Sequence, residues 1–197
     1  QLAKDKKSSW GVNYSYTNLA AYFAVVKQRV DNFKVPALHN AEANFRIKTS
    51  KTGIIKFYAY YNGSALGLRR PDIDSANLKD AFRLDNFNLY ANVSYKEKIG
   101  KKWYMNLGTS FSTNTDKIGF ELQNADNSPA DINHYPYDSK TFNVKTLAEL
   151  SQIKAVFERR LYGLSAIRFG GEYMYFNDKN TFTNRYVTDA RVRVDDH

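Results

Sequence analysis

The chain of 197 residues contains no cysteine, and this absence excludes disulfides and thiolate metal sites. It has only three histidines, which are isolated from one another in the sequence: His39, His134 and His197. A histidine metal site is therefore not expected. No glycine-rich phosphate loop and no nucleophile motif occurs. We expect no catalytic residue, no metal, no cofactor and no enzymatic activity.

Long apolar runs are also missing. The sequence has no 18 consecutive apolar residues, so no transmembrane helix is expected. No signal peptide precedes Gln1, and we expect a mature, trimmed or fragmentary chain. The mean hydropathy of -0.59 is typical of a water-soluble protein. It does not exclude an outer-membrane β-barrel, because only alternate residues of such strands face lipid.

Aromatic residues are abundant, with 15 Tyr and 13 Phe, and many of them alternate with polar residues. The clearest alternation runs from Arg83 to Asn114. Apolar residues occupy every second position in its first arm, opposite Asn, Ser and Tyr: Phe87, Leu89, Ala91, Val93 and Tyr95. The second arm, from Trp103 to Ser112, repeats this pattern. A period of two over about ten residues predicts strands long enough to cross a bilayer.

Similar alternation predicts about eight strands in all. The expected ranges are 9–17, 41–49, 55–61, 86–95, 103–112, 151–160, 165–175 and 182–194. Short turns are expected at 50–53, 96–102 and 160–163, with Gly53 able to adopt a positive φ. Longer connections are expected at 63–82 and 115–141, and a polar connection at 177–180. The first long connection could hold a helical turn at 75–81, and the apolar patch at 20–26 could be a strand extension or a packed loop.

Residues 142–160 allow two interpretations. Their apolar positions change phase, from Val144, Ala148 and Leu150 to Ile153, Ala155 and Phe157, as in a strand with a bulge. The alternative is a helix, because Thr146 and Glu149 have capping-box spacing and Leu147, Leu150 and Phe157 lie near one helical face. We favour the strand because its neighbours are strands.

These patterns predict an all-β fold, an antiparallel up-and-down transmembrane β-barrel of about eight strands. Outer-membrane barrels have short periplasmic turns and long extracellular loops. The orientation would then place the Asp-rich loops outside the cell and the Lys/Arg-rich turns in the periplasm.

The net charge of +9 does not point to nucleic acid, because the basic residues are dispersed over short segments: 4–7, 96–102 and 159–160. They are expected in solvated turns or in contact with lipid phosphates. Asp72 and Asp74 could bind calcium through loop oxygens, but we favour a solvated turn.

Several segments resemble the barrel strands of TonB-dependent outer-membrane receptors, particularly those of Bacteroidota-like bacteria. They are WGVNYSYTNL at 10–19, NFRIKTSKTGIIKFYAYYN at 44–62, DNFNLYANVSYKEKIGKKWYMNLGTSFS at 85–112 and RFGGEYMY at 168–175. The resemblance implies a Gram-negative outer-membrane location and import of a scarce iron chelate or glycan. It also implies that residues 1–197 are one partial β-barrel domain, part of a larger barrel and without a plug domain. Coupling to the TonB energy system would then act through parts absent from this chain.

The residues suggest two sets of candidates for contact with a small-molecule or glycan ligand. Loop residues that could capture it are Arg69, Arg70, Tyr135 and Tyr137, and residues that could line the lumen are Glu42, Arg46, Lys48 and Lys56. For the second set we favour a wall of cross-strand ion pairs over a substrate path. Alternative functions are a complete small eight-stranded barrel with a structural or adhesive role, and a soluble β-protein that binds carbohydrate.

Overall fold

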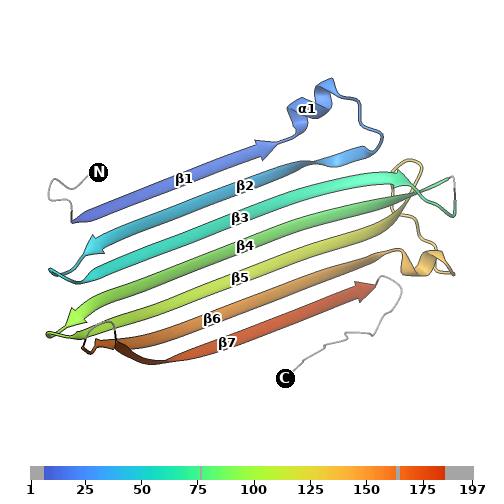
Figure 1. The fold of residues 1–197 in the computed structure, drawn as a ribbon. Coiled ribbons are helices and arrows are strands. Elements are labelled where there is room, and N and C mark those ends of the chain that lie inside the picture. The colour runs from blue at the N-terminus through green and yellow to red at the C-terminus, as the bar shows by residue number, and fades with distance from the viewer. Residues whose placement is uncertain (1–6, 76, 163–164, 185–197) are drawn as a thin grey trace.

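The structure is a computed structural model that describes residues 7–75, 77–162 and 165–184. It confirms the predicted all-β, antiparallel, up-and-down fold, with 74% of the chain in strands. One sheet contains seven strands in sequence order, each paired with the next (Figure 1). The strands are β1 (Ser8–Asn18), β2 (Asp31–Lys48), β3 (Ile54–Pro71), β4 (Leu78–Ile99), β5 (Trp103–Asn124), β6 (Phe142–Arg160) and β7 (Ala166–Asn184). The sheet is not closed, and β1 and β7 form its edges.

The central strands are much longer than the sequence predicts. β4 and β5 each contain 22 residues and remain paired from Ile99↔Trp103 to Leu78↔Asn124. The long connections predicted at 63–82 and 115–141 are therefore wrong over much of their length. The helical turn predicted at 75–81 is also wrong, since β4 begins at Leu78. Side-chain alternation continues through these segments, but the apolar residues change face, and this change hides the strand.

The connections differ from prediction in three further places. The patch at 20–26 contains a short helix, α1 (Ala20–Val25), and β2 begins at Asp31, ten residues before the expected start at Ala41. The turn after β4 needs a left-handed residue at Gly100, with φ of 62°, whereas Gly53 has no positive φ. No helix among the described residues is long and apolar enough to span a membrane.

Residues 142–160 form a continuous strand, so the helical interpretation is wrong. The register of β6 with β5 and with β7 is unbroken, so the predicted bulge is also absent. The phase change arises because the apolar residues of β6 lie on both faces of the sheet. The connection predicted at 177–180 lies inside β7, and the expected eighth strand falls mainly outside the described residues.

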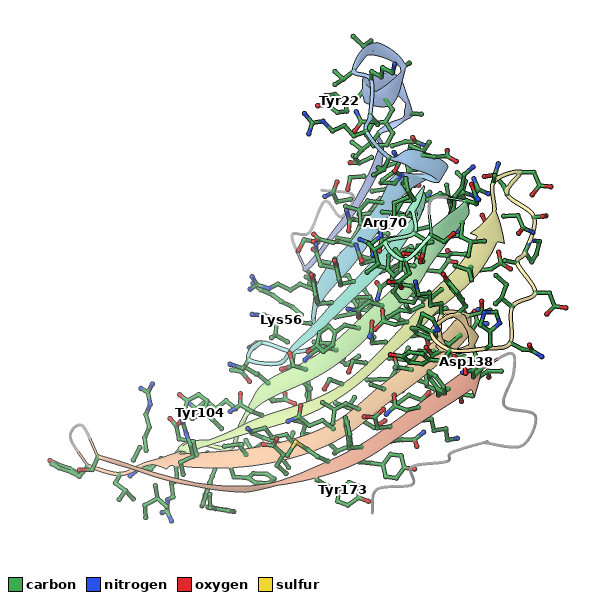
Figure 2. All side chains as sticks on the ribbon, turned by 90° about the vertical axis from the view of Figure 1, so that its right-hand side faces the viewer. Tyr22, Lys56, Arg70, Tyr104, Asp138 and Tyr173 are labelled. Atoms are coloured by element: carbon green, nitrogen blue, oxygen red, sulfur yellow. The ribbon has the colours of Figure 1, made fainter. Side chains whose placement is uncertain are left out.

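The register sorts the side chains into two chemically different faces. Residues directly opposite each other across paired strands lie on the same face. One row crosses all seven strands through Trp10, Phe45, Phe57, Val93, Thr109, Ile153 and Tyr173. The adjacent row on the other face reads Gly11, Asn44, Tyr58, Asn92, Ser110, Gln152 and Met174. Figure 2 shows the curved sheet with Tyr173 of the first face and Tyr104 of the second labelled.

We call the first face, near the short turns, the apolar band. It comprises the Trp10 row and the rows on either side, which contain no charged side chain. These are the row Ser8, Ile47, Ile55, Tyr95, Leu107, Ala155, Gly171 and the row Val12, Ala43, Ala59, Ala91, Phe111, Ser151, Tyr175. We call the opposite face the polar face.

The polarity of the two faces reverses toward the long loops. On the polar face, Phe82, Phe120, Phe142 and Phe182 contact one another, with ring centroids 4.9, 4.7 and 5.5 Å apart. The opposite face there carries charged residues, including Arg83, Asp85 and Lys117. The apolar surface therefore runs along one face near the turns and along the other near the loops.

Very little of this apolar surface is buried. The buried hydrophobic residues of the described chain are Leu78, Ala81, Leu122 and Ala130, and three of them, Leu78, Leu122 and Ala130, form one cluster where the loop that follows β5 packs on the sheet. The solvent-accessible surface is 14344 Å², whereas a compact monomer of 22.7 kDa would expose about 9,500 Å². Trp10, Phe169 and Tyr173, on the edge strands, are more than half exposed. Within the described ranges, the sheet has a defined geometry but little of its apolar surface is covered by other parts of the chain.

The contact between β6 and β7 gives a prediction for two adjacent glycines. A Cβ atom at Gly170 would lie 2.3 Å from the backbone oxygen of Ala155, whereas one at Gly171 would meet nothing within 4 Å. We expect Gly170→Ala to destabilise the folded protein by about 1–3 kcal/mol, because strand β7 must shift. Gly171→Ala should change its stability by less than about 0.5 kcal/mol. Urea unfolding in detergent measures both, and equal effects would contradict this close approach.

Candidate ligand-binding surface

The polar face carries a hollow of about 470 Å³ at its centre. We call it the tyrosine hollow, because Tyr58 and Tyr60 of β3 and Tyr90 of β4 lie along its lining. Tyr60 and Tyr90 are direct cross-strand partners, and the rings of Tyr58 and Tyr90 are 6.2 Å apart and inclined by 52°. The other lining residues come from β4 to β7: Asn88, Ser112, Thr113, Asn114, Ala148, Glu149, Leu150 and Phe176.

Amide side chains surround these rings. The Asn92 amide donates a hydrogen bond of 3.2 Å to the Tyr90 hydroxyl, and the Asn62 amide donates one of 2.6 Å to Asn40. Asn114 accepts a hydrogen bond from Asn86 at 3.1 Å. The bonds of Asn62 and Asn86 run across neighbouring strands, whereas that of Asn92 runs along β4, and all three fix the orientation of the amides. Asn88, inside the hollow, forms no side-chain hydrogen bond within the described part of the chain.

The lining therefore offers aromatic faces, hydroxyls and amides rather than charges. Glu149 also borders the hollow, but it lies in the row of Thr113 and Asn177 on the opposite face, where the Asn177 amide donates a hydrogen bond of 2.9 Å to its carboxylate. Aromatic rings provide apolar contact area, while amides and hydroxyls both donate and accept hydrogen bonds. Such a lining suits an uncharged ligand with many hydroxyl groups.

The four predicted lumen residues all lie on the polar face, at the end near the short turns. Glu42, Arg46 and Lys48 belong to β2, and Lys56 belongs to β3. The cross-strand ion pairs suggested for them are absent from the described residues, because Arg46 stands directly opposite Lys56 and Glu42 opposite Tyr60. Ion pairs of the polar face lie elsewhere: Lys154 pairs with Glu172 at 2.8 Å and Arg168 with Glu158 at 2.6 Å in β6 and β7, and a third pair lies at the loop end of β3 and β4.

The two arginines predicted in an outer loop lie in strand β3, which continues to Pro71. Arg69 donates to Gln123 at 2.7 Å, pairs with Asp31 at 3.1 Å and lies 4.3 Å from the centre of the Phe33 ring. Arg70 lies on the opposite face, 3.6 Å from Asp80, and is labelled in Figure 2 at the loop end of the sheet. Both side chains thus have partners within the chain.

Tyr135 and Tyr137 do lie in the long connection after β5, as predicted. Tyr135 is 86% exposed and available to a partner. Tyr137 begins the short 3-10 helix η1 (Tyr137–Ser139), and its ring lies 5.3 Å from the Lys140 ammonium. The Tyr137 hydroxyl donates to the backbone oxygen of Asp74 at 3.5 Å, so this residue ties two loops together.

Lys140 also connects these two loops. Its ammonium binds the Asp72 carboxylate, whose side chain is fully buried, and the Asp74 carboxylate at 2.6 Å. We call Asp72, Asp74 and Lys140 the loop clasp. Burial would by itself raise the pKa of Asp72, but the hydrogen bonds from Lys140 and the Asp74 backbone outweigh it and lower this pKa. Burial would lower the pKa of Lys140, and the two carboxylates outweigh it and raise this pKa well above its ordinary value.

The loop clasp occupies the place considered for a calcium ion at Asp72 and Asp74. Their carboxylates share a lysine ammonium, which occupies the position that a cation would take. Among the residues that the structure describes, no group of three or more His, Asp or Glu side chains could hold a metal ion.

The sequence predicts the face on which each of these tyrosines lies, because Tyr58 and Tyr60 alternate with apolar residues such as Phe57. It does not predict the tyrosine hollow itself. The signal was the presence of bulky aromatics on a face otherwise made of Asn, Ser and Gly. Only the register brings Tyr58, Tyr60 and Tyr90 together from two strands. Comparisons of the chain with protein-family models, with curated proteins and with solved structures gave no significant match.

Proposed function

We infer that this chain forms part of the wall of an outer-membrane β-barrel of the TonB-dependent receptor type, which imports a scarce ligand into a Gram-negative bacterium. The supporting observation is the apolar band, which continues across all seven strands without a charged residue. Contact with lipid stabilises such an exposed surface, whereas in water a large continuous apolar patch drives association.

The open edges support a barrel larger than this sheet. β1 and β7 each present a row of backbone N–H and C=O groups with no further strand beside them among the described residues. Inside a bilayer every backbone polar group needs a partner, so the edges must pair with additional strands. Additional strands would complete the wall of the receptor, and the TonB energy system would act through those other parts.

The tyrosine hollow bears on whether the ligand is a glycan or an iron chelate. Its lining of Tyr and Asn carries hydroxyl and amide groups, and the one acidic residue that borders it, Glu149, belongs to a row of the opposite face. A glycan presents hydroxyls and apolar ring faces to such a surface, whereas an anionic iron chelate would call for cationic side chains. The proposed ligand is therefore a glycan, which passes along the polar face.

Solubility and mass together test this proposal. The native gene product should require detergent for extraction from outer membranes, because detergent must replace the lipid that covers the apolar band. Its intact mass should be much larger than the 22.7 kDa of this chain, as the missing strands require. Size-exclusion chromatography with mass spectrometry gives both results.

Three outcomes distinguish the alternatives. A monodisperse monomer in buffer without detergent would contradict a membrane wall and favour a soluble carbohydrate-binding β-protein. A detergent-dependent product of 22.7 kDa would favour a small closed barrel with a structural or adhesive role, and import would be abandoned. A larger, detergent-dependent product supports the receptor wall.

A further inference from the structure

Four basic side chains gather just beyond the apolar band on the same face of the sheet. Arg83 of β4, Lys117 of β5, Lys145 of β6 and Lys179 of β7 are all exposed, and we call them the basic rim. Lys117 and Lys145 are direct cross-strand partners. Like charges directly opposite each other destabilise a strand pair unless an anion lies between them.

The acidic residues nearby do not neutralise this pair. Asp85 stands opposite Lys117 but binds Lys34, and it accepts a hydrogen bond of 2.8 Å from Arg83. Glu149 is bonded to Asn177, and Glu121 accepts a hydrogen bond of 2.6 Å from Gln123. Within the described part of the chain, Lys117, Lys145 and Lys179 form no ion pair.

Two hollows flank the opposed lysines. One, of about 560 Å³, is lined by Arg83, Lys117 and Lys145 and by Asp85, whose carboxylate is bound by Arg83 and Lys34, and it borders Gly119, which has no side chain. The other, of about 360 Å³, includes the same two lysines and Asp85 together with Phe87 and Leu147. The lysines therefore lie between a cationic hollow on the loop side and a partly apolar hollow on the side of the band.

The position of the rim matches the surface of a bilayer. Asp85, in the row of Lys117 and Lys145, is eight residues from Val93 at the middle of the apolar band. That separation is about 26 Å along a strand and about 20 Å along the membrane normal at a tilt of about 40°. The hydrocarbon half-layer is about 15 Å thick, so the rim falls at the level of the headgroups.

We propose that the basic rim binds the phosphate group of a lipid headgroup in the leaflet on the side of the long loops. The phosphate lies between Lys117 and Lys145, with Arg83 and Lys179 adding positive charge. An acyl chain of the same lipid follows the hollow past Phe87 and Leu147 onto the apolar band. This inference rests on the proposed membrane location.

Native mass spectrometry of the full gene product in mild detergent tests the site. The probes are dioleoyl phosphatidic acid and dioleoylglycerol, which differ by the phosphate. We expect retention of phosphatidic acid over dioleoylglycerol, and about a 10- to 30-fold weaker affinity for phosphatidic acid in the double variant K117Q/K145Q. The matched control K96Q/K98Q removes the same charge from the polar face and should bind like the wild type. Millimolar inorganic phosphate should not displace the lipid.

The possible results test the lipid site and the membrane location independently of each other. Equal retention of both lipids, or equal affinity in all three proteins, would overturn the lipid site while the detergent-dependent protein still stands as a membrane wall. If inorganic phosphate alone displaces the lipid, the rim is a site for free phosphate and the proposal of a lipid site is overturned. A product that needs no detergent would overturn both proposals.

Discussion

Val93→Arg is expected to prevent stable insertion of the protein into a bilayer. Val93 lies in the middle row of the apolar band, between Phe57 of β3 and Thr109 of β5. An arginine facing lipid near the midplane of a barrel wall costs about 2–4 kcal/mol. The ratio of folded to unfolded protein should therefore fall by about 30- to 1,000-fold. Folding into liposomes, followed by heat-modifiable migration on gels, measures this ratio.

The neighbouring residue provides the control. Asn92 is on the same strand but on the polar face, opposite Tyr58 and Ser110. Asn92→Arg should retain most of its folding, because the new charge meets water and polar side chains rather than lipid. If the two variants lose folding equally, the apolar band does not face lipid and the membrane proposal fails.

Lys140→Met is expected to loosen the loops at the far end of the sheet. This change leaves the fully buried Asp72 carboxylate without its ammonium partner. Removing one partner of a buried ion pair typically costs about 3–5 kcal/mol. We expect somewhat less, about 2–4 kcal/mol, because Lys140 itself remains 20% exposed and water can enter.

Hydrogen exchange measures this loss. The backbone amides of Asp72, Leu122 and Ala130 donate hydrogen bonds that hold the loops, at 2.9, 3.1 and 2.8 Å. They should exchange about 30- to 1,000-fold faster in the variant. Lys51→Met, in an exposed short turn, should leave these amides unchanged. Unchanged protection in Lys140→Met would show that the loops are held without the loop clasp.

The loop clasp also has a defined pH dependence. Asp72 has a lowered pKa, so its contribution to stability is present above its ordinary pKa of 3.8 and is lost as pH falls through the folded value. Lys140 has a raised pKa, so its contribution is complete below 10.5 and is lost only as pH rises beyond that value. Burial and the Asp72 carboxylate raise the pKa of Asp80, in the part of β4 beyond the apolar band.

Asp80 therefore acts in the opposite direction to Asp72. Its folded form holds a proton more tightly than the unfolded chain, so its ionised form lowers stability above the raised pKa. Protection of the loop amides, corrected for intrinsic exchange rates, should rise as pH falls through the raised pKa of Asp80 toward its ordinary value of 3.8. It should then fall again below 3.8 as Asp72 takes up its proton.

The sequence by itself determined the strand character and the two faces near the short turns. Residues such as Phe57 and Val93 alternate with Lys56 and Asn92, and a period of two is compatible only with a strand that has two different surroundings. This local signal needs no knowledge of partners. The short turn at 50–53 and the all-β class followed from it.

Only the tertiary structure decided the full strand lengths and the clusters. In β4, the apolar positions move from Phe87 on one face to Leu84 and Phe82 on the other, so a pattern that assumes one buried face ends there. Pairing with β3 and β5 carries the strand through this change, because backbone hydrogen bonds do not depend on which face is apolar.

The tyrosine hollow, the basic rim and the loop clasp have the same origin. Tyr58 and Tyr90 are 32 positions apart in the sequence, Lys117 and Lys145 are 28 apart, and Asp72 and Lys140 are 68 apart. The antiparallel register and the folding of the loop after β5 over the sheet bring these pairs together. Sequence patterns report the face on which a side chain lies, whereas its neighbours depend on which strands pair and in which register.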